Sequence, residues 1–89
     1  MSARIIKANG VEIPAVPANG TDFQLSELQA IVGGPVEIVP VPNSDSIIVL
    51  HEEGKLEELP INQKATFIYA NPHDVIVGDV LVCPTEMVQ

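Results

Sequence analysis

The sequence predicts a small α+β domain: a mostly antiparallel sheet of five to six short strands, with one or two short helices on one face. Three observations support this class. Valine and isoleucine recur along the chain, and their β-branched side chains favour strands. Eight prolines and six glycines divide the 89 residues into short elements. The chain is long enough for one domain, residues 1–89, and it shows no internal repeat or interdomain linker.

The first predicted element is a β-hairpin, with residues 4–8 and 11–16 as its arms. The arms meet at Asn9-Gly10, a pair that favours the two-residue type I′ turn because both residues tolerate positive φ. Pro14 and Pro17 cannot donate to a ladder of hydrogen bonds, so we expect the second arm at the edge of the sheet.

A helix of two to three turns is expected after Asn19-Gly20. Its apolar residues fall on one stripe of a 3.6-residue repeat: Leu25, Leu28, Ile31 and Val32. Two capping boxes, at residues 21–24 and 26–29, are alternatives for its start. Gly33-Gly34-Pro35 supplies a left-handed residue and then a proline, which together end the helix.

The rest of the chain reads as strands around a second helix. Residues 35–41 and 46–51 are predicted strands, and the second is more apolar and therefore central. A turn follows, in which Gly54 is expected to take positive φ. Residues 62–70 are a candidate second helix with Asn62 as its N-cap. Residues 75–83 are expected to form the last strand, with a bulge at Gly78-Asp79.

The charge balance is strongly acidic. Four lysines and arginines stand against twelve aspartates and glutamates, which gives a formal net charge of −8. Sequence-independent nucleic-acid binding depends on basic residues that displace phosphate counterions, so we expect no nucleic-acid partner. No apolar run approaches the roughly 20 residues of a membrane span, and the first residues lead into no signal-peptide core. We therefore expect no membrane partner either.

No catalytic or metal-binding signature is evident. His51 and His73 show none of the short His, Glu or Cys spacings of zinc sites. Cys83 ends an apolar run just before Pro84, which favours a buried thiol over a nucleophile. As the only cysteine it excludes an internal disulfide and suits a reducing compartment. We expect no enzyme, no metal and no cofactor.

Two segments are candidate binding sites. Asn62 and Lys64 lie at a corner between strand and helix, where a small anion or a nucleotide phosphate could bind the helix N-terminus. The plainer interpretation is that Asn62 only caps the helix. The second segment holds an acidic cluster, which is either a solvated face or a surface for a basic partner protein. Its members are Glu52, Glu53, Glu57 and Glu58.

Three sequence blocks occur in order along the chain: LQxxVGGxxExV at 28–39, EGKxxxLPxNxxA at 53–65 and VGDVLV at 77–82. Together they resemble a family of small domains of unknown function carried by bacteriophages, plasmids and Gram-positive and actinobacterial genomes. The resemblance covers about Ile5 to Cys83. It implies a mobile-element or bacterial origin and the cytoplasm of a bacterium or infected host. It implies no reaction, ligand or catalytic residue.

Two functions of different classes compete. The first is a non-catalytic binding module with a counter-defence or host-modulating role, which binds a host protein through its acidic face or an exposed sheet edge. The alternative is a protein that binds a small molecule and sequesters a nucleotide signal. The pocket for this ligand would form between subunits, because one short chain encloses little volume. A homo-oligomer is compatible with both, since unblocked strand edges can pair across subunits.

Overall fold

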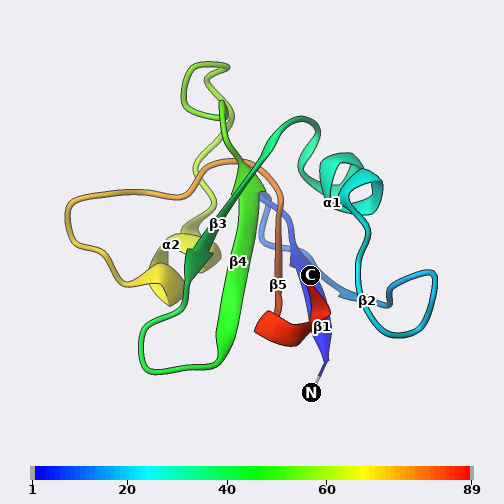
Figure 1. Ribbon diagram of the computed structural model, residues 1–89. Helices are drawn as coiled ribbons and strands as arrows, with labels where there is room; N and C mark the ends of the chain where they lie inside the picture. The colour runs from blue at the N-terminus through cyan, green and yellow to red at the C-terminus, as the bar shows by residue number, and fades with distance from the viewer. Residues whose placement is uncertain (1, 89) are drawn as a thin grey trace.

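Five strands and two helices make up the computed structural model, which describes residues 2–88 (Figure 1). The strands are β1 (Ala3–Ile6), β2 (Glu12–Ala15), β3 (Val36–Pro40), β4 (Ser46–His51) and β5 (Val80–Pro84). The helices are α1 (Leu25–Val32), α2 (Gln63–Tyr69) and a short 3₁₀ turn, η1 (Thr85–Met87). All neighbouring strands are antiparallel, and their order is β2-β1-β5-β4-β3. The predicted α+β class is confirmed, with β2 at an edge and β4 inside the sheet.

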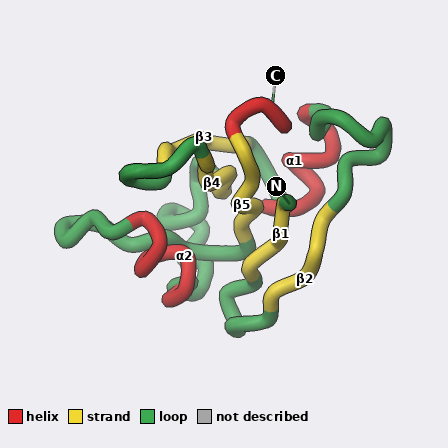
Figure 2. The backbone as a smooth tube through the Cα atoms, turned by 90° about the horizontal axis from the view of Figure 1, so that it is seen from below, coloured by secondary structure: helices red, strands yellow, loops and turns green. Residues whose placement is uncertain are grey.

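The two helices lie on opposite faces of the sheet (Figure 2). We call these the α1 face and the α2 face. Ile47 and Val49 of β4 point into the α1-face core, whereas Ile48 and Leu50 point into the α2-face core. The expectation that the helices share one face therefore fails in this detail. The reason lies in β4 and β5, which are apolar at nearly every position; a sheet covered on one side alternates apolar and polar residues instead.

The hairpin forms as predicted, but its turn differs. Only Gly10 has positive φ (95°), and Asn9 does not. The Lys7 N–H donates to the Val11 carbonyl at 2.8 Å, which closes a three-residue loop rather than a two-residue one. The Asn9 side chain accepts a hydrogen bond from the Val11 N–H, so it stabilises the loop without taking the left-handed conformation.

Helix α1 ends where the sequence indicates but begins elsewhere. Gly33 takes the left-handed C-cap conformation with φ of 88°. The N-cap is Gln24, and its backbone N–H donates to the Glu27 side chain at 2.8 Å in a capping box. Neither predicted box forms. One reason is that Thr21 bonds the Asn19 side chain in the preceding turn, through both its N–H and its hydroxyl.

Two later glycines also serve a different purpose from the one predicted. Gly54 has no positive φ; instead, an added Cβ would lie 2.9 Å from a Val77 methyl group, so the position requires close packing. No bulged strand forms over residues 75–79. Val77 makes one isolated bridge with Ile61, and Gly78, at φ of 79°, turns the chain into β5. Asn62 caps α2 as predicted, accepting from the Ala65 N–H.

Candidate functional site

The acidic cluster lies on a loop that projects beyond the end of β4 (Figure 1). We call residues 52–58 the acidic loop. Its four glutamates are all exposed. The backbone of the loop is nevertheless held in place: the Glu52 N–H donates to the Pro35 carbonyl at 2.8 Å, and the Leu59 N–H donates to the Gly54 carbonyl at 3.0 Å. The four predicted glutamates thus lie exposed on one loop whose backbone is held by hydrogen bonds.

His51 is buried at the base of this loop, with 3% of its surface exposed. Its Nδ1 accepts a hydrogen bond from the Glu53 N–H at 3.0 Å, so the proton of the neutral ring is on Nε2. Within residues 2–88, Nε2 has no hydrogen-bond partner; the nearest carboxylate oxygen, Glu57 Oε1, is 3.6 Å away. The ring is packed against Gly34. His51 therefore holds the start of the acidic loop through its hydrogen bond with the Glu53 N–H.

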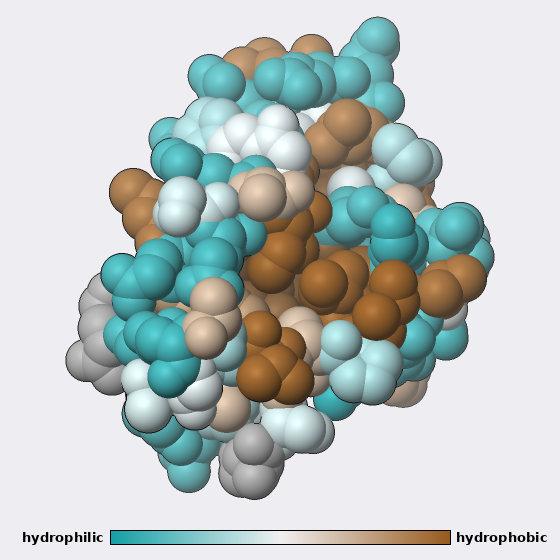
Figure 3. Space-filling view, turned by 90° about the vertical axis from the view of Figure 1, so that its right-hand side faces the viewer, coloured by the Kyte–Doolittle hydropathy of each residue, from teal (hydrophilic) through white to brown (hydrophobic). Residues whose placement is uncertain are grey.

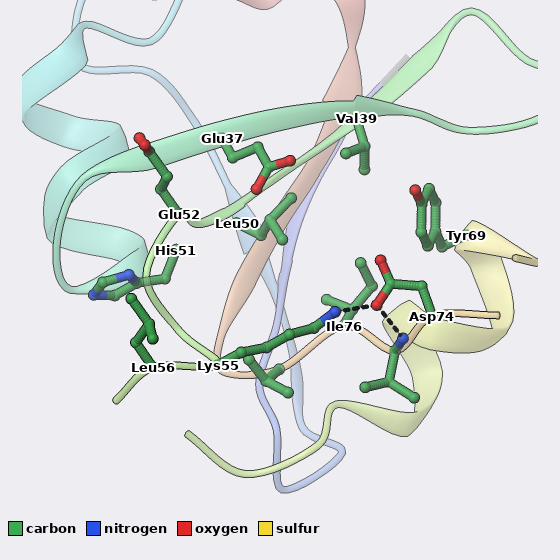
Figure 4. Close-up of a pocket in the computed structure, with 12 residues that line it drawn as sticks. Glu37, Val39, Leu50, His51, Glu52, Lys55, Leu56, Tyr69, Asp74 and Ile76 are labelled. Atoms are coloured by element: carbon green, nitrogen blue, oxygen red, sulfur yellow. Dashed lines mark hydrogen bonds and ion pairs between the residues drawn. The ribbon is translucent and has the colours of Figure 1, made fainter. Parts of the chain in front are cut away.

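A cavity of about 130 Å³ lies beside the loop on the α2 face (Figure 4). Val39 and Leu50 form its apolar floor, and Lys55 reaches across it to pair with Asp74. The charged and polar groups around it are Glu37, Glu52, Lys55, Tyr69 and Asp74. The His51 ring turns away from the cavity (Figure 4). Pockets for drug-sized ligands usually measure about 300–1,000 Å³, so this one fits the end of a side chain better than a nucleotide.

The Lys55–Asp74 pair leaves this cavity with an excess of negative charge. The hydrogen bond from Lys55, and then the one from the Val75 N–H, hold the pKa of Asp74 below its ordinary value. Asp74 is therefore ionised at neutral pH. Three residues that line the cavity carry carboxylates (Glu37, Glu52 and Asp74) and one carries an ammonium group (Lys55), so the cavity suits a cationic group.

The structure uses Asn62 and Lys64 to join elements. Asn62 is fully buried, and its amide donates to the carbonyls of Ile6 (2.8 Å) and Gly78 (2.9 Å) while its oxygen caps α2. Lys64 Nζ bonds the Gly10 carbonyl (2.7 Å) and pairs with Glu12 (3.1 Å). Both amide hydrogens of Asn62 are thus occupied, and the Lys64 charge is compensated. An anion at this corner would therefore find no free amide hydrogen on Asn62.

The remaining titratable candidates are apart from one another. His73 is exposed in the turn before β5, and Cys83 is 1% exposed in the α1-face core. Burial, followed by the nearby Glu86 charge, raises the pKa of the Cys83 thiol to about 11. Within residues 2–88, no three His, Cys, Asp or Glu side chains are grouped as metal ligands would be. Nor is any helix of residues 2–88 long and apolar enough to cross a membrane.

The outer edge of β3 is a further candidate surface, and no local motif in the sequence identifies this strand as the open edge. The Val41 N–H donates to Ser46 and the Glu52 N–H donates to Pro35, so the odd-numbered residues of this ladder face β4. Val36 and Ile38 consequently direct their N–H and C=O groups outward. Which residues face outward depends on the residue pair that closes the β3–β4 hairpin. The proline-containing connection between the two strands does not indicate this pair in the sequence.

The outer edge of β2 is less open. The Lys7–Val11 bond fixes the alternation in this ladder, so Glu12, Pro14 and Val16 face outward. Pro14 has no N–H and interrupts the row of donors at its centre. A strand added at β2 would lose its middle hydrogen bond, whereas one added at β3 would not.

A third surface is apolar and lies on the side that carries α1 and β2 (Figure 3). Figure 3 shows apolar side chains gathered in a hollow there. The exposed apolar residues of these segments are Ile13 on β2, Val16 just after it and Leu25 at the start of α1.

The comparisons with known proteins point to one family. A family model described as a domain of unknown function (DUF3846) matches residues 4–87. No curated protein matches the chain, and no solved structure matches it.

Proposed function

The chain belongs to the DUF3846 family, and from this premise we propose that it is a non-catalytic interaction module that binds a partner protein. The partner we propose is a host protein, in the cytoplasm of a bacterium, and the module is encoded by a bacteriophage or similar mobile element. There it would modulate a host function or counter a host defence. Origin and setting rest on the resemblance of the three sequence blocks.

The observation that carries the proposal is the ordered acidic loop. A solvated, purely solubilising face needs no fixed backbone, whereas this loop is bonded to Pro35, to His51 and to itself. Its four glutamates are exposed on one loop of a chain whose net charge is already −8. A partner with a basic patch would be steered to it and oriented by it.

Catalysis is left out of the proposal because of where the reactive groups lie. The Cys83 thiol is buried and protonated at neutral pH, and it lies on the α1 face beneath α1. His51 has its Nδ1 engaged by the loop backbone. Nucleophilic catalysis needs a nucleophile and a base within hydrogen-bonding reach of each other.

The test is capture of host proteins on the immobilised chain, compared between two variants of equal charge. Glu53→Gln with Glu58→Gln removes two loop charges; Asp22→Asn with Asp45→Asn removes two charges elsewhere. We expect the first variant to retain at least tenfold less of the captured partner than the second, with the partner also lost at about 0.5 M salt. Equal capture by the two variants, or capture unchanged up to about 1 M salt, would refute the role of the loop.

A further inference from the structure

We infer that the outer edge of β3 is a docking site for an extended, basic segment of a partner protein, which joins the sheet as a sixth strand. The inference rests on the proposed function, because it names the part of the partner that the module would bind. Three observations support it: the outward hydrogen-bonding groups of the β3 backbone, the negative charge of the adjacent cavity, and the charge repulsion that would oppose a second copy of this chain at the same edge.

The backbone of β3 offers a regular row of hydrogen-bonding groups. Val36 and Ile38 present both donor and acceptor outward, and the Pro40 carbonyl adds one more acceptor. Exposed edges are usually protected by a central proline, a bulge or a lysine. Pro14 protects β2 in this way, but β3 carries its only proline at its last residue. An added strand is the ligand that such an edge fits.

The side chains beside this edge select a basic segment. Glu37 and Val39 point to the α2 face, where they line the cavity. In a sixth strand, every second side chain would lie on this face next to Glu37. A lysine or arginine there can lay its apolar stem along Val39 and place its charge near Glu37 and Asp74. Its positive charge would offset the excess negative charge of the cavity, because the residues that line it include three carboxylates and one lysine, Lys55.

The other face of the same edge is apolar. Ile38 points to the α1 face and is 46% exposed, and Val36 beside it is partly buried against the core. A segment that alternates basic and apolar residues would thus match both faces. A second copy of this chain meets the apolar requirement but not the basic one: symmetric pairing of two β3 edges would bring the Glu37 side chains of the two copies close to each other, in molecules that each carry −8.

The probe is a terminally blocked heptapeptide of alternating valine and lysine, added to the ¹⁵N-labelled protein. We expect the amide resonances of Val36 and Ile38 to shift and both amides to become protected from hydrogen exchange. The matched peptide of alternating valine and glutamate should bind at least tenfold more weakly. Shifts confined to other elements, or equal binding of the two peptides, would overturn the inference.

Variants of the chain separate the backbone from the side chains. Ile38→Pro removes an outward-facing N–H without breaking a hydrogen bond to β4, since this residue does not donate to β4. Ile38→Ala also loses the isoleucine side chain but keeps that N–H. We expect the proline variant to bind the lysine peptide at least tenfold more weakly than the alanine variant. The double variant Glu37→Gln with Glu52→Gln should weaken binding of the lysine peptide by a similar factor, and it leaves the backbone unchanged. If the proline variant does not fold, this double variant still tests whether the peptide binds beside β3.

Two further outcomes are distinct. Protection of Val36 and Ile38 that rises with protein concentration and needs no peptide would show a second copy on the edge, against the inference. Failure of the peptide experiments, while capture still depends on Glu53 and Glu58, would overturn this inference alone. Failure of both would remove the proposed function as well.

Discussion

At the scale of single residues, Asn62 does more for the fold than its position in the sequence suggests. Its side chain makes three buried hydrogen bonds, to α2, to β1 and to the segment before β5. Asn62→Ala would lose an N-cap, which typically costs about 1 kcal/mol, and would leave two buried carbonyls without this donor, at about 1 kcal/mol or more each. We expect a decrease of roughly 2–4 kcal/mol in the free energy of unfolding, measured with urea.

The matched control is Asn71→Ala, the same chemical change in an exposed turn. The Asn71 side chain accepts one hydrogen bond, from the His73 N–H, and links no two elements of the fold. We expect its effect to be below about 1 kcal/mol. If the two variants unfold at the same urea concentration, Asn62 is not the link between α2 and the sheet that the structure indicates.

Cys83 gives a prediction about pH. Its pKa rises from 9.0 to about 11 in the folded chain because of burial and the Glu86 charge. The unfolded chain releases this proton first as the pH increases, so the contribution of the thiol to stability is complete below pH 9.0 and is lost as the pH rises toward 11. We expect Cys83→Ala to show a smaller decline in stability than the wild type between pH 9 and 11. Parallel declines would contradict this burial.

At the scale of elements, the contact between the end of α1 and the end of β4 is tight. A Cβ added at Gly34 would overlap His51 Nε2 and lie 2.8 Å from its Cε1. We expect Gly34→Ala to destabilise the chain by about 1–3 kcal/mol through overpacking. In a His51→Ala background the same change should cost much less, because the ring is gone. A double-mutant cycle by urea unfolding measures the difference. Equal costs in both backgrounds would exclude this contact as the cause.

Elements with local signals were predictable, and those decided by distant contacts were not. Gly33 ends α1 and Asn62 begins α2, as a glycine and an asparagine at these positions indicate. The start of α1 is not predictable from the local sequence, because Asn19 engages Thr21 and so removes one capping candidate. The role of Gly54 is not predictable either, because the residue that requires a glycine there, Val77, lies 23 positions along the chain.

The candidate site divides in the same way. The glutamates of the acidic loop are adjacent in sequence, so their clustering could be predicted. The outward groups of β3 could not, because they depend on the register of a ladder closed by the Val41–Ser46 hydrogen bond. The cavity could not be predicted either, because Glu37 of β3 and Asp74, which both line it, are far apart in the sequence.

At the scale of the whole molecule, one sheet supports two cores. β4 and β5 contribute to both, because their successive residues point to opposite faces. Neither core can be lost without exposing these shared strands to water. A chain of this size buries only a limited apolar surface, so one core alone would not stabilise the sheet. The two faces should therefore unfold together in one transition.

Two neighbouring isoleucines test this cooperativity. Ile47 points to the α1 face and Ile48 to the α2 face, and Ile→Val at either position should cost about 0.5–1.5 kcal/mol. Tyr69, packed against the α2-face core, reports on one face by fluorescence, while circular dichroism reports on the whole sheet. Because the strands are shared, we expect Ile47→Val to lower the midpoint of both signals equally, although Tyr69 is on the other face. If it moves the dichroism transition and leaves the Tyr69 transition in place, the α2 face unfolds as a separate unit.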